Sequence, residues 1–141
     1  MSASNTQFSI AIHLMAGLGY SGRLDLTSTE LASSVNACPS FVRRILSKLS
    51  KAGLVRTSRG KSGTCLLARP AEGITLLHIY HAVDAPKVFA VHSYPAQSLC
   101  PVSCGFKHMI EKVLEKSQDS FEETLTKTSL ADIIGDIKKG E

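Results

Sequence analysis

The most constraining feature of the sequence is an amphipathic stretch that begins at Pro39 and ends at Gly53. Its apolar residues recur at the spacing of one helical face: Val42, Ile45, Leu46 and Leu49. Pro39 suits the first position of a helix, and Gly53 suits the left-handed residue that follows a helix end. The other face carries basic and hydroxyl side chains. This helix is therefore expected to bury one side and to present the other to a polar or charged partner.

The neighbouring segments predict further elements around this helix. A shorter helix is expected before it, capped by Thr27 or Ser28 and ending near Asn36. Strands are expected at 54–58 and 64–68, joined by a turn, so that they form a hairpin with a basic tip. The remaining expectations are helices at 5–18, at 74–83, from about 105 onward and at 130–137 after a Ser129 cap, with an irregular segment at 84–103.

Two short helices followed by a basic hairpin predict a winged helix-turn-helix. The fold class is therefore mainly α with a small β-hairpin wing, followed by a long helix. We expect two domains, a winged helix-turn-helix DNA-binding domain at 1–84 and a second domain at 85–141. The second would contain the connecting segment, the long helix and the last helix.

The charge distribution supports a polyanionic partner. Between Leu31 and Ala71 there are eight Lys and Arg residues and no Asp or Glu. Because the whole chain has a net charge of +4, the rest of the chain carries −4. A basic stretch of this kind is typical of proteins that bind nucleic acid, although a solvated basic face without a partner has the same signature.

A helix that enters the major groove needs donors for phosphates and base edges on its outer face. Arginine can bind guanine with two hydrogen bonds, and lysine acts mainly as a charge directed at phosphate. An arginine on a glycine-flanked hairpin tip can enter a narrow minor groove. The candidate DNA-binding residues are Thr27, Ser40, Arg43, Arg44, Ser47, Lys48, Lys51, Arg59 and Lys61.

Other function classes fit the sequence less well. We find no Ser/His/Asp arrangement, paired carboxylates or phosphate-cradling loop, so an enzyme is not expected. No apolar run approaches a membrane span, and the N-terminus lacks the blocks of a signal peptide, which predicts a cytoplasmic protein without a membrane partner. The alternative that stays open is a winged-helix interaction module whose basic face binds an acidic protein.

The run from Leu31 to Val55 resembles the Rrf2 family of bacterial winged-helix transcription regulators. The wing Ser58-Arg59-Gly60-Lys61-Ser62-Gly63 resembles the Arg-Gly-x-x-Gly-Gly wing of that family. Phe89-Ala90-Val91-His92 with Leu99-Cys100-Pro101-Val102 is similar to one subgroup. The resemblance covers residues 5–134. It implies a homodimeric regulator, here expected to be a repressor, whose two heads read a pseudo-palindromic operator in double-stranded DNA.

The resemblance also implies a dimerisation role for the long helix. An apolar stripe on it is too hydrophobic for a solvent-exposed helix, so we expect it to pack on the second subunit. The stripe consists of Ile110, Val113, Leu114, Phe121 and Leu125.

Family members that carry a [2Fe–2S] cluster use three closely spaced cysteines before the long helix. This chain has only Cys100 and Cys104 there, so no resident cofactor is expected. The alternative is a [2Fe–2S] cluster or another metal in a mixed site of His92, Cys100, Cys104 and His108, although its spacing is looser than that of the usual metal knuckle.

Thiol sensing is the favoured use of the cysteines, with inert packing of small apolar residues as the competing interpretation. Cys38 precedes Pro39, where the helix N-terminus and Arg43 or Arg44 would lower its pKa. A small ligand is the other signal left open. The redox candidates are Cys38, Cys65, Cys100 and Cys104.

Overall fold

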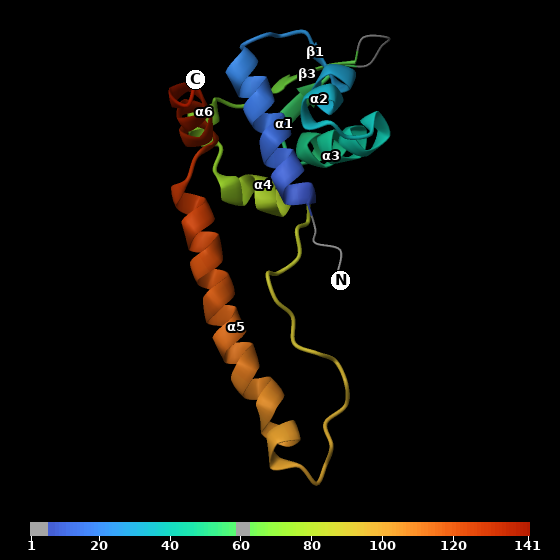
Figure 1. Cartoon of the computed structure of the whole chain (residues 1–141), viewed down its shortest axis with the longest axis vertical. Helices are drawn as coiled ribbons and strands as arrows, with labels where there is room; N and C mark the ends of the chain where they lie inside the picture. Colours follow the sequence, from blue (N-terminus) through green and yellow to red (C-terminus); the bar gives the residue numbers. More distant parts are fainter. Residues whose placement is uncertain (1–5, 59–62) are drawn as a thin grey trace. The chain divides into compact units, whose positions relative to one another are not determined.

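The computed structural model describes residues 6–58 and 63–141. Packing divides the chain into two compact units (Figure 1). Unit 1 comprises the residues up to 85 together with 125–141, and unit 2 comprises 86–124. Arg59 and Lys61, which we expected at the tip of the hairpin, lie outside the described residues.

Unit 1 is a set of helices around a small antiparallel sheet. The strands lie in the order β1-β3-β2, with Leu26 opposite Cys65 and Val55 opposite Leu67. The mainly helical fold with a β-hairpin is therefore confirmed. In chain order the elements are α1 (Gln7–Ser21), β1 (Leu26–Thr27), α2 (Ser28–Val35), α3 (Pro39–Lys51), β2 (Val55–Thr57), β3 (Thr64–Leu67), the 3-10 turn η1 (Ala71–Gly73), α4 (Leu76–Ala82) and α6 (Leu130–Lys139).

The helix ends follow local sequence signals. Thr27 caps α2, and its side chain and that of Glu30 form a capping box. Gly53 adopts the left-handed conformation expected of it, with φ 77°. Ser129 caps α6, as expected, through a second capping box with Asp132. Two short elements were not predicted, the 3-10 turn η1 and the strand β1. β1 has two residues, too few to show the alternation that marks a strand.

The core of unit 1 contains residues from α1 near the start of the chain and from α6 near its end. Leu14 and Met15 of α1, Ile45 and Leu49 of α3 and Leu130 of α6 are all fully or almost fully buried. Backbone hydrogen bonds from Leu76 to Thr128 (2.9 Å) and from Leu130 to Ile74 (2.7 Å) join the starts of α4 and α6. We expected α6 in the second domain, at 85–141, but its packing on α1 groups it with unit 1.

Unit 2 consists of segment 86–100 and most of α5 (Pro101–Lys127). The segment runs antiparallel to the helix. Val88 N donates to Gln118 Oε1 (3.0 Å), His92 stacks on Phe106, and the Lys107 ammonium donates to the Tyr94 carbonyl. The helix begins at Pro101, four residues before the expected start at 105. Proline has no N–H to lose at the first position, so Pro101 starts this helix instead of delaying it.

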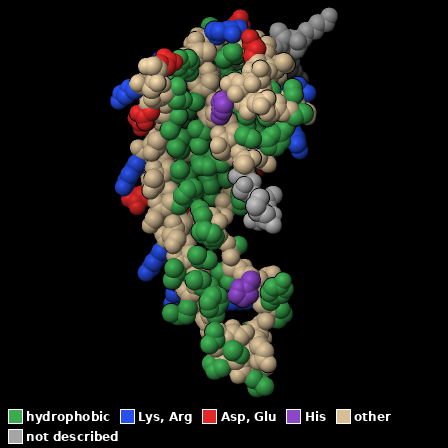
Figure 2. Space-filling view, viewed as in Figure 1, with side chains coloured by type: hydrophobic (Ala, Val, Ile, Leu, Met, Phe, Trp, Pro, Cys, Tyr) green, Lys and Arg blue, Asp and Glu red, His purple; other side chains and the backbone are tan. Residues whose placement is uncertain are grey.

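Much of the apolar surface in unit 2 faces outward. Figure 2 shows hydrophobic side chains gathered towards the lower end of α5, with charged side chains along its outer edge. The most exposed large apolar residues of the unit are Phe89, Tyr94, Leu99, Val102 and Met109. Within the described ranges, no helix combines the length and apolar character needed to span a bilayer.

Candidate nucleic-acid interface

Helix α3 presents a polar face because its apolar residues are used in the core. Val42, Ile45 and Leu46 are at most 1% exposed, and they hold α3 in the core of unit 1, where it packs against α2. The exposed side is made of Ser40, Arg43, Arg44, Ser47 and Lys51. The structure thus places five of the predicted DNA-binding residues on one exposed side of one helix.

A concave site of about 400 Å³ lies beside this face, and we name it the notch. Two cations and five hydroxyl groups surround a floor that includes Leu46 and the buried Cys65. Its described lining contains no carboxylate. The lining residues are Ser28, Arg43, Leu46, Ser47, Ser50, Lys51, Thr57, Ser58, Gly63 and Cys65. Such a lining matches the chemistry of a phosphodiester, whose oxygens accept hydrogen bonds and carry negative charge.

The hairpin side of the notch is held by local hydrogen bonds. Ser58 N donates to the Thr64 carbonyl (2.9 Å), and Thr64 N donates to the Ser58 hydroxyl (3.1 Å). The two hydroxyl oxygens lie 2.7 Å apart. These bonds fix the ends of β2 and β3 beside α3, so the hydroxyl groups of the notch have defined positions.

Three of the predicted DNA-binding residues also interact with other groups of the chain. Lys48 lies on the flank of α3, where its ammonium donates to Gln7 Oε1 of α1 (3.0 Å). The Arg44 guanidinium stacks over the Phe41 ring, 5.4 Å from its centroid. The Thr27 hydroxyl accepts the capping hydrogen bond of α2. The sequence did not indicate Ser28, Ser50, Thr57 and Ser58, since scattered hydroxyl residues give no periodic signal until the fold brings them together.

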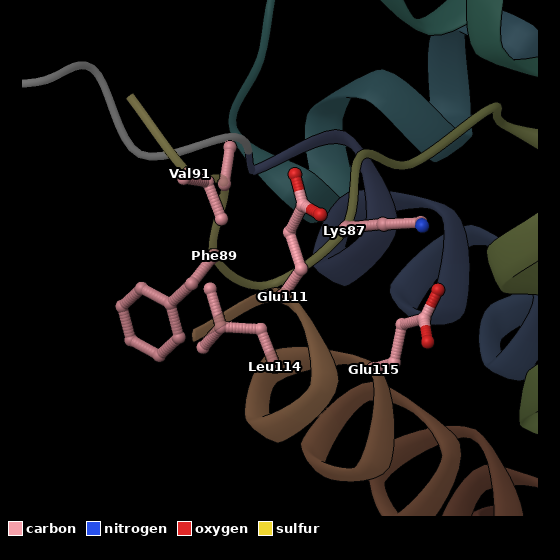
Figure 3. Close-up of a pocket in the computed structure, with 7 residues that line it drawn as sticks. Lys87, Phe89, Val91, Glu111, Leu114 and Glu115 are labelled. Carbon is pink, nitrogen blue, oxygen red and sulfur yellow. The ribbon is translucent and has the colours of Figure 1, made fainter. Parts of the chain in front are cut away.

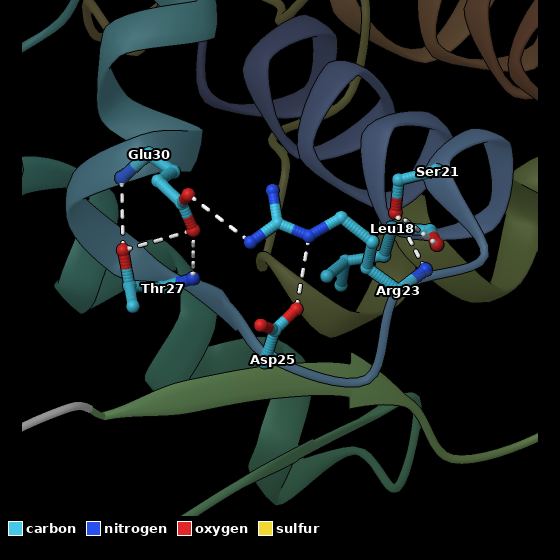
Figure 4. Close-up of polar contacts among 6 residues, drawn as sticks. All are labelled: Leu18, Ser21, Arg23, Asp25, Thr27 and Glu30. Carbon is cyan, nitrogen blue, oxygen red and sulfur yellow. Dashed lines mark hydrogen bonds and ion pairs between the residues drawn. The ribbon is translucent and has the colours of Figure 1, made fainter.

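The carboxylates at the entrance of α2 are neutralised locally (Figure 4). Arg23 donates to Asp25 (2.9 Å) and to Glu30 (3.3 Å), and it holds the pKa of Asp25 below its ordinary value. The pKa of Glu30 is lowered chiefly by the backbone N–H of Thr27, with Arg23 contributing further. Neither carboxylate lines the notch, so its cationic character is retained.

The geometry of α3 and the hairpin agrees with what comparison with known proteins finds. A model of the Rrf2 family, described as an iron-dependent transcriptional regulator, matches residues 4–136. The HTH-type transcriptional regulator YwnA of Bacillus subtilis (strain 168) is 34% identical over 132 residues, which cover 92% of this chain and 96% of YwnA. The chain belongs to the Rrf2 family of transcriptional regulators.

Solved structures of Rrf2 proteins confirm the winged-helix fold with its long C-terminal helix. CymR, the global cysteine regulator of B. subtilis, is 20% identical with a TM-score of 0.70, and the match covers 96% of this chain and 98% of CymR. IscR of T. potens is 21% identical with a TM-score of 0.73, and the match covers 99% of this chain and 91% of IscR.

Within this Rrf2 chain, Cys38 occupies the position before α3 that the sequence indicated. It is the exposed N-cap residue, and its sulfur lies 3.1 Å from the Ser40 hydroxyl oxygen. Hydrogen bonds from the Ser40 hydroxyl and from the backbone N–H groups of Ser40 and Phe41 lower the pKa of the Cys38 thiol. Arg43 adds a smaller effect in the same direction. The expected influence of Arg43 is present, but hydrogen bonding dominates.

The other three cysteines differ in accessibility. Cys65 is buried on the floor of the notch, and burial raises the pKa of its thiol, which makes it the least suited of the redox candidates. Cys100 is half-buried, and its sulfur accepts a hydrogen bond from Ser103 N (3.4 Å). Cys104 is exposed, and its thiol donates to the carbonyls of Gln97 (3.5 Å) and Ser98 (3.7 Å).

The donor set of unit 2 does not fit the iron–sulfur cluster that some Rrf2 proteins carry. Cluster-binding members of the family use three closely spaced cysteines before the long helix, whereas this chain has only Cys100 and Cys104 there. Across residues 6–58 and 63–141, no three His, Cys, Asp or Glu side chains converge as a metal site would require. His92 stacks on Phe106, and His108 is exposed.

The predicted dimer stripe on α5 is only partly exposed. Val113 is 55% exposed, whereas Ile110, Leu114 and Phe121 are half-buried within the chain. Leu125 is 8% exposed and belongs to unit 1, so it has little surface to offer a second subunit.

Proposed function

We propose that this regulator binds double-stranded DNA as a homodimer and represses transcription, with α3 in the major groove. The observation that carries the proposal is the cationic and hydroxyl-rich face of α3 together with the notch beside it. A helix of this kind fits the major groove. An acidic side chain would repel phosphate, and the described lining of the notch has none. We assign the chain no catalytic activity.

The two parts of this surface have different roles in the proposal. The cationic groups of the notch are Arg43 and Lys51. In this proposal the notch contacts the phosphate backbone and sets the position of the head on the duplex. Ser40 and Arg44, at the start of α3, lie where recognition helices contact base edges. Affinity then depends mainly on the notch, and sequence preference depends mainly on the first turns of α3.

A second copy of the chain completes the proposal. Four exposed apolar residues of α5 recur at intervals of four, three and four residues, which is the spacing of a helix–helix seam: Val102, Phe106, Met109 and Val113. We name this set the α5 seam. It shares only Val113 with the stripe predicted from the sequence. Burying the seam against its copy would remove exposed apolar surface and place two heads on a two-fold axis.

The proposed signal acts at Cys38. The Cys38 thiolate attacks one oxygen of hydrogen peroxide, the O–O bond breaks, and a sulfenic acid forms with release of hydroxide. A low-molecular-weight thiol, or Cys100 or Cys104 of the second subunit, then displaces water to form a disulfide. Because Cys38 caps α3, this adduct would disturb the helix that carries Arg43 and Arg44 and release the DNA.

A salt titration of duplex binding tests the notch. Arg43→Gln and Lys51→Gln should each weaken binding and reduce the slope of log affinity against log salt by about one, because each removes one phosphate contact. The control is Arg69→Gln, which removes an exposed charge of the same basic stretch outside the notch. Equal effects of Arg43→Gln and Arg69→Gln would contradict a defined phosphate contact and favour the acidic-protein alternative.

A further inference from the structure

Unit 2 contains a hollow that the DNA-binding proposal does not use. It has a volume of about 360 Å³ and lies between segment 86–100 and α5, and we name it the α5 hollow. Figure 3 shows side chains from the segment facing side chains that rise from the helix. The lining residues are Lys87, Phe89, Ala90 and Val91 from the segment, and Glu111, Leu114 and Glu115 from α5.

A part-buried hydrogen bond joins the segment to the helix at this place. Val88 N donates to Gln118 Oε1 (3.0 Å), and Gln118 is a buried polar side chain, 8% exposed. Val88 stands between Lys87 and Phe89 in the sequence, so this bond fixes both residues beside the hollow. Gln118 follows Leu114 by one helical turn, so this hydrogen bond lies next to the hollow.

The charged groups of the α5 hollow form no ion pairs with the described residues. Glu111 and Glu115 are four residues apart, so they share a face of α5 about 6 Å apart along its axis, where like charges repel. Over the described parts of the chain, neither carboxylate nor the Lys87 ammonium makes an ion pair. With one cation and two carboxylates, the lining has a net charge of −1.

These charges are arranged in order along the hollow. In Figure 3, Lys87 and Glu115 lie at one end, the apolar side chains of Phe89, Val91 and Leu114 lie at the other, and Glu111 lies between them. Together these groups match a ligand that has a carboxylate and an ammonium at one end, an apolar stem, and a second cation within reach of Glu111.

We propose that the α5 hollow binds a basic α-amino acid. Its carboxylate pairs with Lys87, its α-ammonium pairs with Glu115, and its side-chain cation lies between Glu111 and the face of Phe89. The methylene stem rests on Leu114. The net charge of +1 on the ligand balances the −1 of the lining. A neutral amino acid would leave the Glu111 carboxylate without a cation. A diamine would place an ammonium beside the Lys87 ammonium. Because the charged groups are exposed, we expect affinity in the millimolar range.

Three related compounds test this assignment by calorimetry or ligand-observed NMR on the full chain. Lysine should bind saturably and more tightly than norleucine, which lacks the terminal amine, and than cadaverine, which lacks the carboxylate. Glu111→Gln should weaken lysine binding about two- to fivefold and leave norleucine unchanged. Lys87→Gln should weaken lysine and norleucine, which present a carboxylate to Lys87, and should not weaken cadaverine, which does not.

Asp119→Asn is the matched control, because it makes the same charge change as Glu111→Gln on an exposed part of α5 outside the hollow. Circular dichroism checks that each variant is folded. Equal binding of the three compounds, no saturable binding of lysine, or an equal effect of Asp119→Asn and Glu111→Gln would overturn the proposal. No DNA is present in these measurements, so their outcome does not depend on the DNA-binding proposal.

Discussion

At the scale of single residues, the surroundings of each cysteine decide its chemistry. The sequence placed Cys38 before a helix, and the structure confirms that position. The sequence could not show that the Ser40 hydroxyl lies beside the Cys38 sulfur, because the side chain of a serine can adopt several rotamers. It also left Cys65 as a redox candidate, since the burial of this residue depends on how β3 packs against α1 and the neighbouring strands.

The lowered pKa of Cys38 leads to a prediction about its reactivity. Below its ordinary pKa a thiol is mostly protonated, so a lowered pKa increases the reactive thiolate fraction at neutral pH. Alkylation of Cys38 should therefore reach half of its maximal rate at a lower pH than alkylation of a free thiol. Mass-spectrometric mapping over a pH series measures this rate at each cysteine.

Ser40→Ala is the companion variant, because it removes the largest cause of the shift and should move the Cys38 profile back to higher pH. Cys65, whose pKa is raised by burial, should react slowest in the native chain. A Cys38 profile that matches a free thiol would reject the reactive-thiol assignment. Loss of DNA on oxidation in Cys38→Ser would instead move the switch to Cys100 or Cys104.

At the scale of elements, local signals predicted the helices and most of their ends. The apolar spacing of α3, the cap at Ser129 and the left-handed Gly53 depend on neighbouring residues, so sequence alone sufficed. The pairing of β1 with β3 and the packing of α6 on α1 depend on residues far apart in the sequence. No local pattern specified those contacts.

The contact between α1 and α6 can be tested with two glycines of α1. A Cβ on Gly19 would lie 2.3 Å from Ile134 Cδ1, whereas a Cβ on Gly17 would meet Leu31 Cδ2 at an ordinary 3.5 Å. Gly17→Ala should therefore stabilise the chain by up to about 1 kcal/mol through helix propensity. Gly19→Ala should destabilise it relative to Gly17→Ala, because the buried Ile134 side chain must shift and overpacking costs about 1–3 kcal/mol. Denaturant unfolding measures both free energies.

Ile134→Val removes the methyl group that a Cβ on Gly19 would meet, so it should recover part of the stability lost in Gly19→Ala. If Gly19→Ala and Gly17→Ala have equal effects on the free energy of unfolding, α6 does not approach α1 as closely as described. The grouping of α6 with unit 1 would then be wrong.

At the scale of the whole molecule, the sequence predicted a DNA-binding regulator better than it predicted the detailed surfaces. The basic stretch indicated the site because its charges are adjacent in the sequence. The notch hydroxyls come from α2, α3 and the hairpin, so they became visible only when the fold joined them. The predicted dimer stripe included Leu125, which the chain buries internally, since periodicity cannot tell an internal contact from an external one.

Selection of bound duplexes from a random library tests the central claim most directly. It is run in parallel on the wild-type chain and on Met109→Glu/Val113→Glu, which places charges on the α5 seam. The wild type should enrich a two-fold symmetric site whose half-sites lie one helical turn, or a multiple of it, apart. The seam variant should sediment as a monomer and fail to enrich that paired site. Enrichment of no sequence by the wild type, or the same paired site from both proteins, would contradict a dimeric DNA-binding regulator assembled through the seam.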